Sequence, residues 1–271
     1  MAALAGQAVM LDPDTFTSPD SYTIARLATG GTVQAAEHAV AEREPAFALV
    51  RPPGHHAEAD RAMGFCVFNN VAVAAAAMLA RGLTRIAIVD IDVHHGNGTQ
   101  ATFYEEPRVL YVSTHQFPFY PGTGAADEIG AGAGRGFTVN IPMDAGCTDA
   151  DYALVHREVV EPVLDEFRPE LVLVSAGFDA HERDPLASMR MTTEGYSAVV
   201  GLLRDVARRH GALALVTEGG YDLTALGACL EASVAVLDGG IAPAIEAREA
   251  PRGARAAAQA RAALKPLWRA L

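Results

Sequence analysis

RIAIVDIDVHHGNG, at residues 85–98, joins a short apolar run to a cluster of carboxylate and imidazole side chains. The run at residues 85–90 is apolar between its two charged ends, which is typical of a strand buried on both faces of a parallel sheet. In the extended segment that follows, residues two apart point to the same side, so Asp90, Asp92 and His94 share one face. Asp92 and His94 are therefore able to bind one cation together.

Similar apolar runs recur along the chain and alternate with segments of helical periodicity. The remaining predicted strands are residues 46–50, 109–112, 137–141, 171–175 and 213–217. Between several of them lie predicted helices at residues 70–81, 150–167, 193–210 and 223–237, and a last helix is expected near residues 255–271. Buried strands separated by helices predict one α/β domain over residues 1–271, with three α/β/α layers around a parallel sheet.

The composition excludes several classes of protein. A net charge of −12 argues against a nucleic-acid binder, which needs a basic face, and is compatible with a cationic substrate. Three scattered cysteines are too few for a disulfide framework. Residues 1–10 lack the features of a secretory signal, and no apolar run approaches the ~20 residues of a membrane span. We therefore expect a cytoplasmic protein that does not enter membranes.

Chemically unusual residues follow four of the predicted strands. Besides the quoted segment, these are Arg51-Pro-Pro-Gly-His-His56, Ala176-Gly-Phe-Asp-Ala-His181 and Glu218-Gly-Gly-Tyr221. Each motif alone is weak, because an Asp-x-His pair occurs often by chance and Gly-Gly-Tyr is usually an ordinary turn. In a parallel α/β sheet, ligands bind outside the carboxyl ends of the strands. Four such motifs at that edge indicate a catalytic site.

The order of the motifs and their amino-acid sequences resemble those of the histone deacetylase superfamily, which has an arginase-like α/β fold. The resemblance covers roughly residues 12–238 and is closest to the bacterial branch related to class II deacetylases. It rests on the segments already quoted together with Gly64-Phe-Cys-Val-Phe-Asn-Asn and Tyr120-Pro-Gly-Thr-Gly. It implies hydrolysis of acetyl or similar acyl groups from amines. Acetylated lysine in peptides or proteins and acetylated polyamines are the two substrate classes that it implies.

The resemblance also implies a metal site formed by Asp92, His94 and Asp179. Two carboxylates and one imidazole leave coordination positions open, as a catalytic zinc requires. Zn²⁺ is the expectation, and the oxygen-rich ligand set also accepts Fe²⁺ or Co²⁺. A structural monovalent cation, usually K⁺, is implied at Asp90, Asp92, His94, Ser113 and Thr114.

The tandem histidines and one tyrosine match the catalytic residues of the family. His56 is the expected general base and then general acid, while His55 is kept cationic by Asp90 and adds electrostatic stabilisation. Asn97 stands where class I-like members carry Asp and is expected to orient His56. Because an amide does not raise the basicity of an imidazole as a carboxylate does, a lower pKa of His56 is predicted. Tyr221 matches the tyrosine whose hydroxyl stabilises the developing oxyanion.

The resemblance also implies an acyl-lysine channel with Phe65 and Tyr120 as its walls. Gly64 directly precedes Phe65 and belongs to the same predicted channel. Flat rings flank an aliphatic stem and exclude water without demanding hydrogen bonds. Asp14 is a candidate rim carboxylate that holds a substrate backbone. Leu186 occupies the place of a gatekeeping Glu in polyamine-selective relatives, which favours acyl-lysine.

The chain departs from the family pattern at its start, because the usual first strand and its His-Pro-Glu-like loop are missing before residue 12. The sequence leaves open two alternatives to a protein deacetylase: an acetylpolyamine deacetylase, and an inactive acyl-amine-binding or scaffold protein. An arginase-like ureohydrolase with two Mn²⁺ ions ranks low, because His95-Gly96-Asn97 supplies no bridging carboxylate. A homo-oligomer is compatible with the sequence.

Overall fold

The fold is built on a parallel sheet of six strands, seen in a computed structural model that describes residues 5–246 and 249–271. Residues 1–4, part of the stretch expected to lack a secretory signal, lie outside the described residues. The strand order is β3-β8-β7-β4-β5-β6, and all pairs are parallel. The strands are β3 (Ala46–Ala48), β4 (Ile86–Asp90), β5 (Val109–Gln116), β6 (Thr138–Met143), β7 (Leu171–Ala176) and β8 (Ala212–Thr217).

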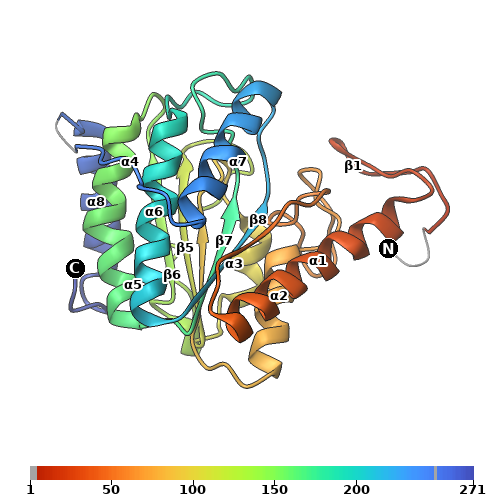
Figure 1. Ribbon diagram of the computed structural model, residues 1–271, viewed down its shortest axis with the longest axis horizontal. Coiled ribbons are helices and arrows are strands. Elements are labelled where there is room, and N and C mark those ends of the chain that lie inside the picture. Colours follow the sequence, from red (N-terminus) through yellow and green to blue (C-terminus); the bar gives the residue numbers. More distant parts are fainter. Residues whose placement is uncertain (1–4, 247–248) are drawn as a thin grey trace.

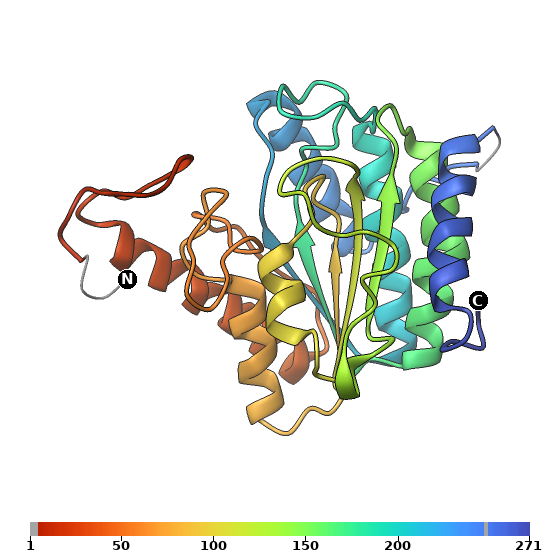
Figure 2. The same ribbon diagram turned by 180° about the vertical axis from the view of Figure 1, so that it is seen from behind.

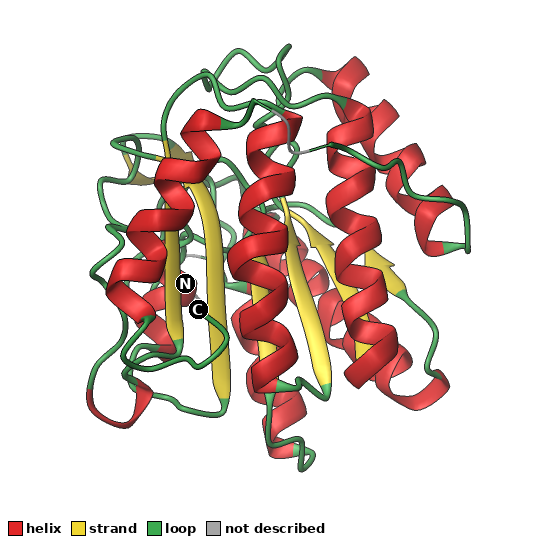
Figure 3. Cartoon of the chain, turned by 90° about the vertical axis from the view of Figure 1, so that its left-hand side faces the viewer, coloured by secondary structure: helices red, strands yellow, loops and turns green. Residues whose placement is uncertain are grey.

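Helices cover both faces of the sheet, which gives the three-layer α/β/α architecture (Figure 1). One layer holds α1 (Ser21–Glu42), α2 (Asn70–Ala80) and α3 (Asn97–Phe103). The other layer, which faces the viewer in Figure 3, holds α4 (Asp149–Val155), α5 (Glu161–Phe167), α6 (Thr193–His210), α7 (Leu223–Leu237) and α8 (Pro251–Leu264). The predicted fold class is confirmed.

Alternate residues of the central strands enter different cores. In β4, Ala87 and Val89 pack in the core beneath α4 to α8, whereas Ile86 and Ile88 pack beneath α1 and α2. All five β4 residues are buried. A strand buried on both faces needs apolar side chains at nearly every position, which explains why the six runs were visible in the sequence.

Several elements differ from the predictions. The strand predicted at residues 109–112 continues to Gln116, because its polar end remains buried beside β6. The helix predicted at 150–167 is interrupted by a π-helical turn, His156–Val160. The last helix is α8, which begins earlier and ends at Leu264, and Trp268 then donates its Nε1–H to the carbonyl of Gly136. The prediction of a helix up to residue 271 was therefore wrong.

The N-terminal part of the described chain forms elements that the sequence did not predict. A short antiparallel hairpin pairs β1 (Met10–Asp12) with β2 (Thr15–Phe16), and α1 follows it. Figures 1 and 2 show both extending beyond the main body of the sheet. Within the described residues, no helix combines the length and hydropathy that a membrane span requires.

The direction in which the chain adds strands to the sheet switches between the central neighbours β4 and β7. From β4 the chain continues outward to β5 and β6, and it then returns to β7 on the other side of β4. In open α/β sheets the crevice at such a switch point, outside the carboxyl ends of the strands, is the usual ligand site. The segments after β4 and β7 carry Asp92, His94 and Asp179.

Candidate active site

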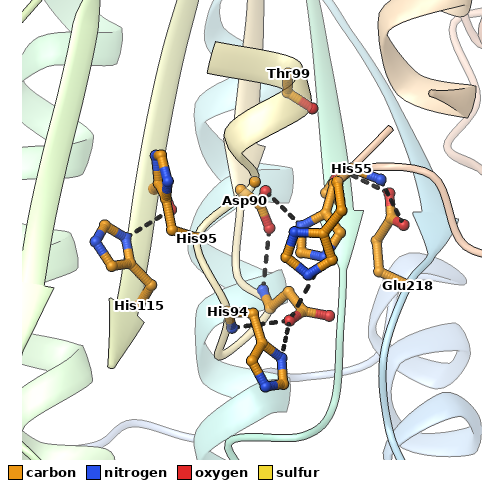
Figure 4. Close-up of polar contacts among 12 residues, drawn as sticks. His55, Asp90, His94, His95, Thr99, His115 and Glu218 are labelled. Atoms are coloured by element: carbon orange, nitrogen blue, oxygen red, sulfur yellow. Dashed lines mark hydrogen bonds and ion pairs between the residues drawn. The ribbon is translucent and has the colours of Figure 1, made fainter. Parts of the chain in front are cut away.

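Three side chains predicted as metal ligands converge at this switch point. The ligand atoms of Asp92, His94 and Asp179 all lie within 4.8 Å of one another, and all three residues are buried. Nδ1 of His94 is 3.1 Å from Oδ1 of Asp92 and 3.1 Å from Oδ2 of Asp179 (Figure 4 shows this region). The structure therefore brings together residues that are 85 positions apart in the chain.

Backbone amides fix the orientation of both carboxylates. Gly219 donates its N–H to Oδ2 of Asp92 at 2.8 Å, and Val93 donates its N–H to Oδ1 of Asp179 at 2.9 Å. A Cβ atom at Gly219 would lie 2.2 Å from Oδ2 of Asp179, so only glycine allows the chain to approach this closely. The ligands are thus held in place by the framework of the sheet.

The electrostatics of the three residues fit a divalent cation. Burial opposes protonation of His94, yet its hydrogen bonds to Asp179 and Asp92 raise its pKa to about 10. Burial and the charge of Asp92 raise the pKa of Asp179 to about 6. Nδ1 of His94 therefore faces two desolvated carboxylates, whose negative charge needs a cation beside it. A divalent ion would supply that charge, and the donor set suits Zn²⁺, Fe²⁺ or Co²⁺.

His55 is held as a cation next to this cluster. Its Nδ1 lies 3.0 Å from Oδ2 of Asp90, and its Nε2 lies 3.8 Å from Oδ1 of Asp92. Burial lowers the pKa of His55, but the charges of Asp90 and Asp92 outweigh burial and raise it well above its usual value. The pairing with Asp90 is the one that the sequence predicted.

His56 has the opposite electrostatic character. Its Nδ1 lies 2.9 Å from Oδ1 of Asn97, as predicted, and its pKa is well below the usual value. Burial and the charge of His55 cause this decrease, while the hydrogen bond with Asn97 raises the pKa. The direction matches the sequence prediction and the cause does not. Within the described residues no hydrogen bond engages Nε2 of His56, so a neutral imidazole presents a free nitrogen.

Three aromatic rings lie beside His56, His94 and Tyr221. The ring of Tyr120 meets His56 edge-on, with centroids 5.2 Å apart, and Phe119 stacks on His94 at 5.4 Å. Phe65 contacts Tyr221 edge-on at 5.9 Å. Phe65 and Tyr120 are 41% and 37% exposed, which is suitable for rings that line an opening.

Tyr221 follows β8 and is positioned through its backbone, since its N–H donates to Oδ2 of Asp184 at 2.7 Å. Burial and the charges of Asp92 and Asp179 raise the pKa of its hydroxyl, which therefore stays protonated and able to donate. A cavity of about 660 Å³ lies beside Tyr221 and Phe65, between α7 and the end of β3.

The other predicted residues make contacts outside the metal-ligand cluster. Asp14, in the β1–β2 turn, accepts a hydrogen bond from the N–H of Gly64 at 3.0 Å and thereby holds the Phe65 loop. Ser113 pairs with Asp90 in the sheet, and the Thr114 hydroxyl donates to the carbonyl of Asp90 at 3.5 Å. The side chain of Leu186 is 43% exposed, and none of its described contacts joins it to the cluster.

Sequence reasoning missed three residues that contact the site. Glu218 is half-buried and accepts hydrogen bonds from the backbone of Gly54 at 2.6 Å and of His55 at 3.2 Å, and desolvation of its carboxyl raises its pKa to about 7. Phe119 stacks on His94 and directly precedes the predicted Tyr120. Glu58 accepts a hydrogen bond from the side chain of Asn97 at 2.7 Å. An acid directly after an apolar strand, as at Glu218, was the available signal.

The comparisons with known proteins agree with this geometry. The histone deacetylase domain family matches residues 2–237. A probable deacetylase of Archaeoglobus fulgidus is 45% identical over 217 residues, covering 79% of this chain and 60% of the relative. A histone deacetylase-like amidohydrolase of Pseudomonas aeruginosa is 46% identical over 218 residues, covering 78% of this chain and 57% of the relative. This chain thus spans roughly three fifths of the length of these two relatives.

A solved structure, the crystal structure of the HDA15 HD domain, superimposes with a TM-score of 0.90 at 39% sequence identity. The match covers 97% of this chain and 73% of that chain. Fold, site geometry and sequence similarity together lead to one conclusion: the chain belongs to the histone deacetylase family.

Proposed function

We propose that the protein is a metal-dependent deacetylase that hydrolyses the amide of acetylated amines. One observation carries the proposal: a neutral His56 with a free Nε2 lies beside the buried trio Asp92, His94 and Asp179. A general base next to a site that can hold a Lewis acid is the arrangement that amide hydrolysis requires. The names of the relatives, a probable deacetylase and a histone deacetylase-like amidohydrolase, support the same reaction.

A divalent ion at Asp92, His94 and Asp179 would polarise the amide carbonyl and lower the pKa of a water molecule. His56 accepts a proton at Nε2 from the attacking water and later returns it to the leaving amine nitrogen. Tyr221 donates its hydroxyl hydrogen to the carbonyl oxygen as negative charge develops there. His55 remains protonated and contributes a fixed positive charge beside the reaction.

The aromatic rings support a linear acyl-lysine chain as substrate. Tyr120 stands on the His56 side of the site and Phe65 on the Tyr221 side, so an aliphatic stem fits between flat apolar surfaces. Leu186 offers no carboxylate to a second amine of a polyamine. Acetyl-lysine in peptides or proteins is therefore the proposed substrate, and acetylated polyamines are the competing class.

Zn²⁺ is the proposed catalytic ion, and a structural K⁺ is proposed at Asp90, Asp92, His94, Ser113 and Thr114. In favour of the second ion, Asp90 and Ser113 are neighbours in the sheet and both are buried. A binuclear ureohydrolase site finds no support, because Asn97 binds His56 and adds no ligand. The described part of the chain holds a single group of three candidate metal ligands.

Metal content and turnover of a fluorogenic acetyl-lysine peptide test the proposal, with Asp179→Ala as the control. We expect about one zinc per chain, turnover that a chelator removes, and loss of both in the variant. Stoichiometric zinc without turnover of the peptide or of acetylspermine would instead establish a binding or scaffold protein.

A further inference from the structure

We propose that Glu58 is a positioning residue that sets the tautomer of His56 by fixing the orientation of the Asn97 side chain. The inference rests on the proposed function, because it concerns the general base of that reaction. Glu58 follows His56 by two positions, in a turn that closes with a hydrogen bond from its own N–H to the carbonyl of Arg61 at 2.9 Å.

Asn97 lies between the two residues and contacts both. Its Oδ1 is 2.9 Å from Nδ1 of His56, and its Nδ2 donates to Oε1 of Glu58 at 2.7 Å. The other contacts of Nδ2 are long, at 3.4 Å to the carbonyl of His56 and 3.5 Å to the sulfur of Met63. The bond to Glu58 is therefore the short contact that holds the amide group.

An asparagine alone does not determine which histidine tautomer it stabilises. If the amide turns by 180°, its NH₂ group faces the imidazole, and Nδ1 then has to accept a hydrogen bond instead of donating one. The proton of the neutral imidazole would move to Nε2, and the nitrogen that faces the substrate would lose its lone pair. Such a turned amide would leave His56 unable to act as the base.

A carboxylate removes this ambiguity, because it only accepts hydrogen bonds. The carboxylate of Glu58 keeps the NH₂ group of Asn97 on its own side, so Oδ1 faces His56. Nδ1 of His56 must then carry the proton, which leaves Nε2 free as a base. In this chain the carboxylate of Glu58 thus orients the imidazole of His56 indirectly, through the neutral amide of Asn97.

The position of Glu58 allows this role without placing another charge beside the metal ligands. Glu58 is half-buried and lines an open cavity of about 600 Å³, together with Asp60, Arg61 and Asn69. The imidazole of His56 contacts Tyr120 and His94, which are not among the residues that line this cavity. Glu58 therefore acts on His56 through Asn97 and does not touch the substrate.

Substitutions that change only the hydrogen-bonding character of residue 58 test the inference. Glu58→Lys introduces a group that only donates, so it should attract Oδ1 of Asn97 and turn the amide. Glu58→Gln can accept or donate and should give a mixture of both tautomers. In the double variant Glu58→Lys with Asn97→Asp, the introduced carboxylate accepts from both neighbours, so the original tautomer should return.

The tautomer is read from two-bond ¹H–¹⁵N correlation spectra of ¹⁵N-histidine-labelled protein, with and without zinc. The His56 signals are assigned by comparison with His56→Gln. The matched control is Asp60→Lys, which makes the same change of charge on the same exposed turn. We expect the Nδ1–H form in wild-type protein and in the control, and the Nε2–H form in Glu58→Lys.

Turnover should follow the tautomer. Since general base catalysis contributes about 10²–10⁴-fold, kcat/KM should fall about 100-fold in Glu58→Lys and less than about tenfold in Glu58→Gln. The double variant should recover most of the loss. Unchanged tautomer and turnover in Glu58→Lys and Glu58→Gln would overturn the inference, as would a double variant no better than Glu58→Lys.

The spectra separate this inference from the proposed function. If the wild-type protein hydrolyses neither acetyl-lysine peptide nor acetylspermine but the tautomer inverts in Glu58→Lys, the proposed function fails and the control of the tautomer stands. If Glu58→Lys does not fold, the Glu58→Gln spectrum decides: a single Nδ1–H form identical to the wild type contradicts the role of Glu58.

Discussion

Replacing Gly64 with alanine should damage the site through one contact. Gly64 has a φ of +55°, and a Cβ atom built on it would lie 2.3 Å from Cδ2 and 2.8 Å from Cγ of His56. The left-handed conformation costs a non-glycine residue about 1–2 kcal/mol. Overpacking against a well-held ring adds about 1–3 kcal/mol. The free energy of unfolding should therefore fall by about 2–5 kcal/mol, which lowers Tm by roughly 5–15 °C.

The same overlap forces His56 to move. Real Cβ contacts essentially never fall below 3.0 Å, so the imidazole must retreat by about 0.7 Å or more. Because a misplacement of about 1 Å can cost about 100-fold in rate, we expect kcat/KM for an acetyl-lysine peptide to fall between about 10- and 100-fold. Zinc content should stay at the wild-type value, because Gly64 contacts none of the proposed ligands.

Gly82→Ala is the matched control for this experiment. Gly82 also has a positive φ, +103°, but a Cβ atom there would meet nothing within 4 Å. This variant should lower Tm through backbone strain alone and leave kcat/KM unchanged. Thermal unfolding and steady-state kinetics of both variants decide the matter. A Gly64→Ala enzyme with wild-type kcat/KM would refute the reasoning, because the overlap would then have been relieved without displacing His56.

Four further outcomes are expected from the site. Tyr221→Phe should lower kcat about 10²–10³-fold with unchanged zinc content, and near-normal turnover would remove the hydroxyl from the mechanism. In Asp92→Asn the amide oxygen can still accept the hydrogen bond from the backbone N–H, but the charge of the ligand is lost. Zinc binding should therefore weaken by more than about 100-fold in a chelator competition assay. Zinc affinity should rise about tenfold per pH unit between pH 7 and 9, because binding displaces the proton of His94, whose pKa is about 10 without metal. Calorimetry in two buffers should find about one proton released per bound ion. A zinc affinity that does not depend on pH would contradict this expectation. Glu218 has a folded-state pKa of about 7, above its unfolded value, so its contribution to stability is full at low pH and is lost as pH rises toward 7. Between pH 5 and 7 the free energy of unfolding of the wild type should therefore fall by about 2 kcal/mol more than that of Glu218→Gln. Equal pH dependence of the two proteins in denaturant titrations would be the contrary result.

The strands and the metal ligands were predictable because their signals are local. A strand such as β4 is buried on both faces, so its apolar run is visible in the sequence alone. Asp92 and His94 are two residues apart, so their proximity was visible in the sequence, although residues 92–94 form a bend and not the extended segment that was predicted. Helix α1 was not predicted because Gly30 and Gly31 lie in its middle, and packing against α2 overrides their low helix propensity.

The contacts that orient the site were not predictable, because they depend on the order of the strands. Glu218 meets the backbone of Gly54, 164 residues away, only because β3 and β8 are neighbours in the sheet. No local pattern determines that pairing. The contact between Glu58 and Asn97 likewise requires that α3 begin beside the turn that follows β3. Periodicity identifies elements, whereas contacts between distant elements require the fold.

The backbone hydrogen bonds to Asp92 and Asp179 have a consequence for how the family can diversify. A main-chain N–H survives every substitution except proline, so mutations in neighbouring side chains cannot delete the groups that orient these carboxylates. Gly219 is the exception, since a Cβ there would collide with Asp179. Residues with exposed side chains, such as Phe65 and Leu186, contact neither carboxylate and are under no such constraint. Substrate preference is therefore free to drift over evolutionary time while the chemistry at the ligands is inherited unchanged.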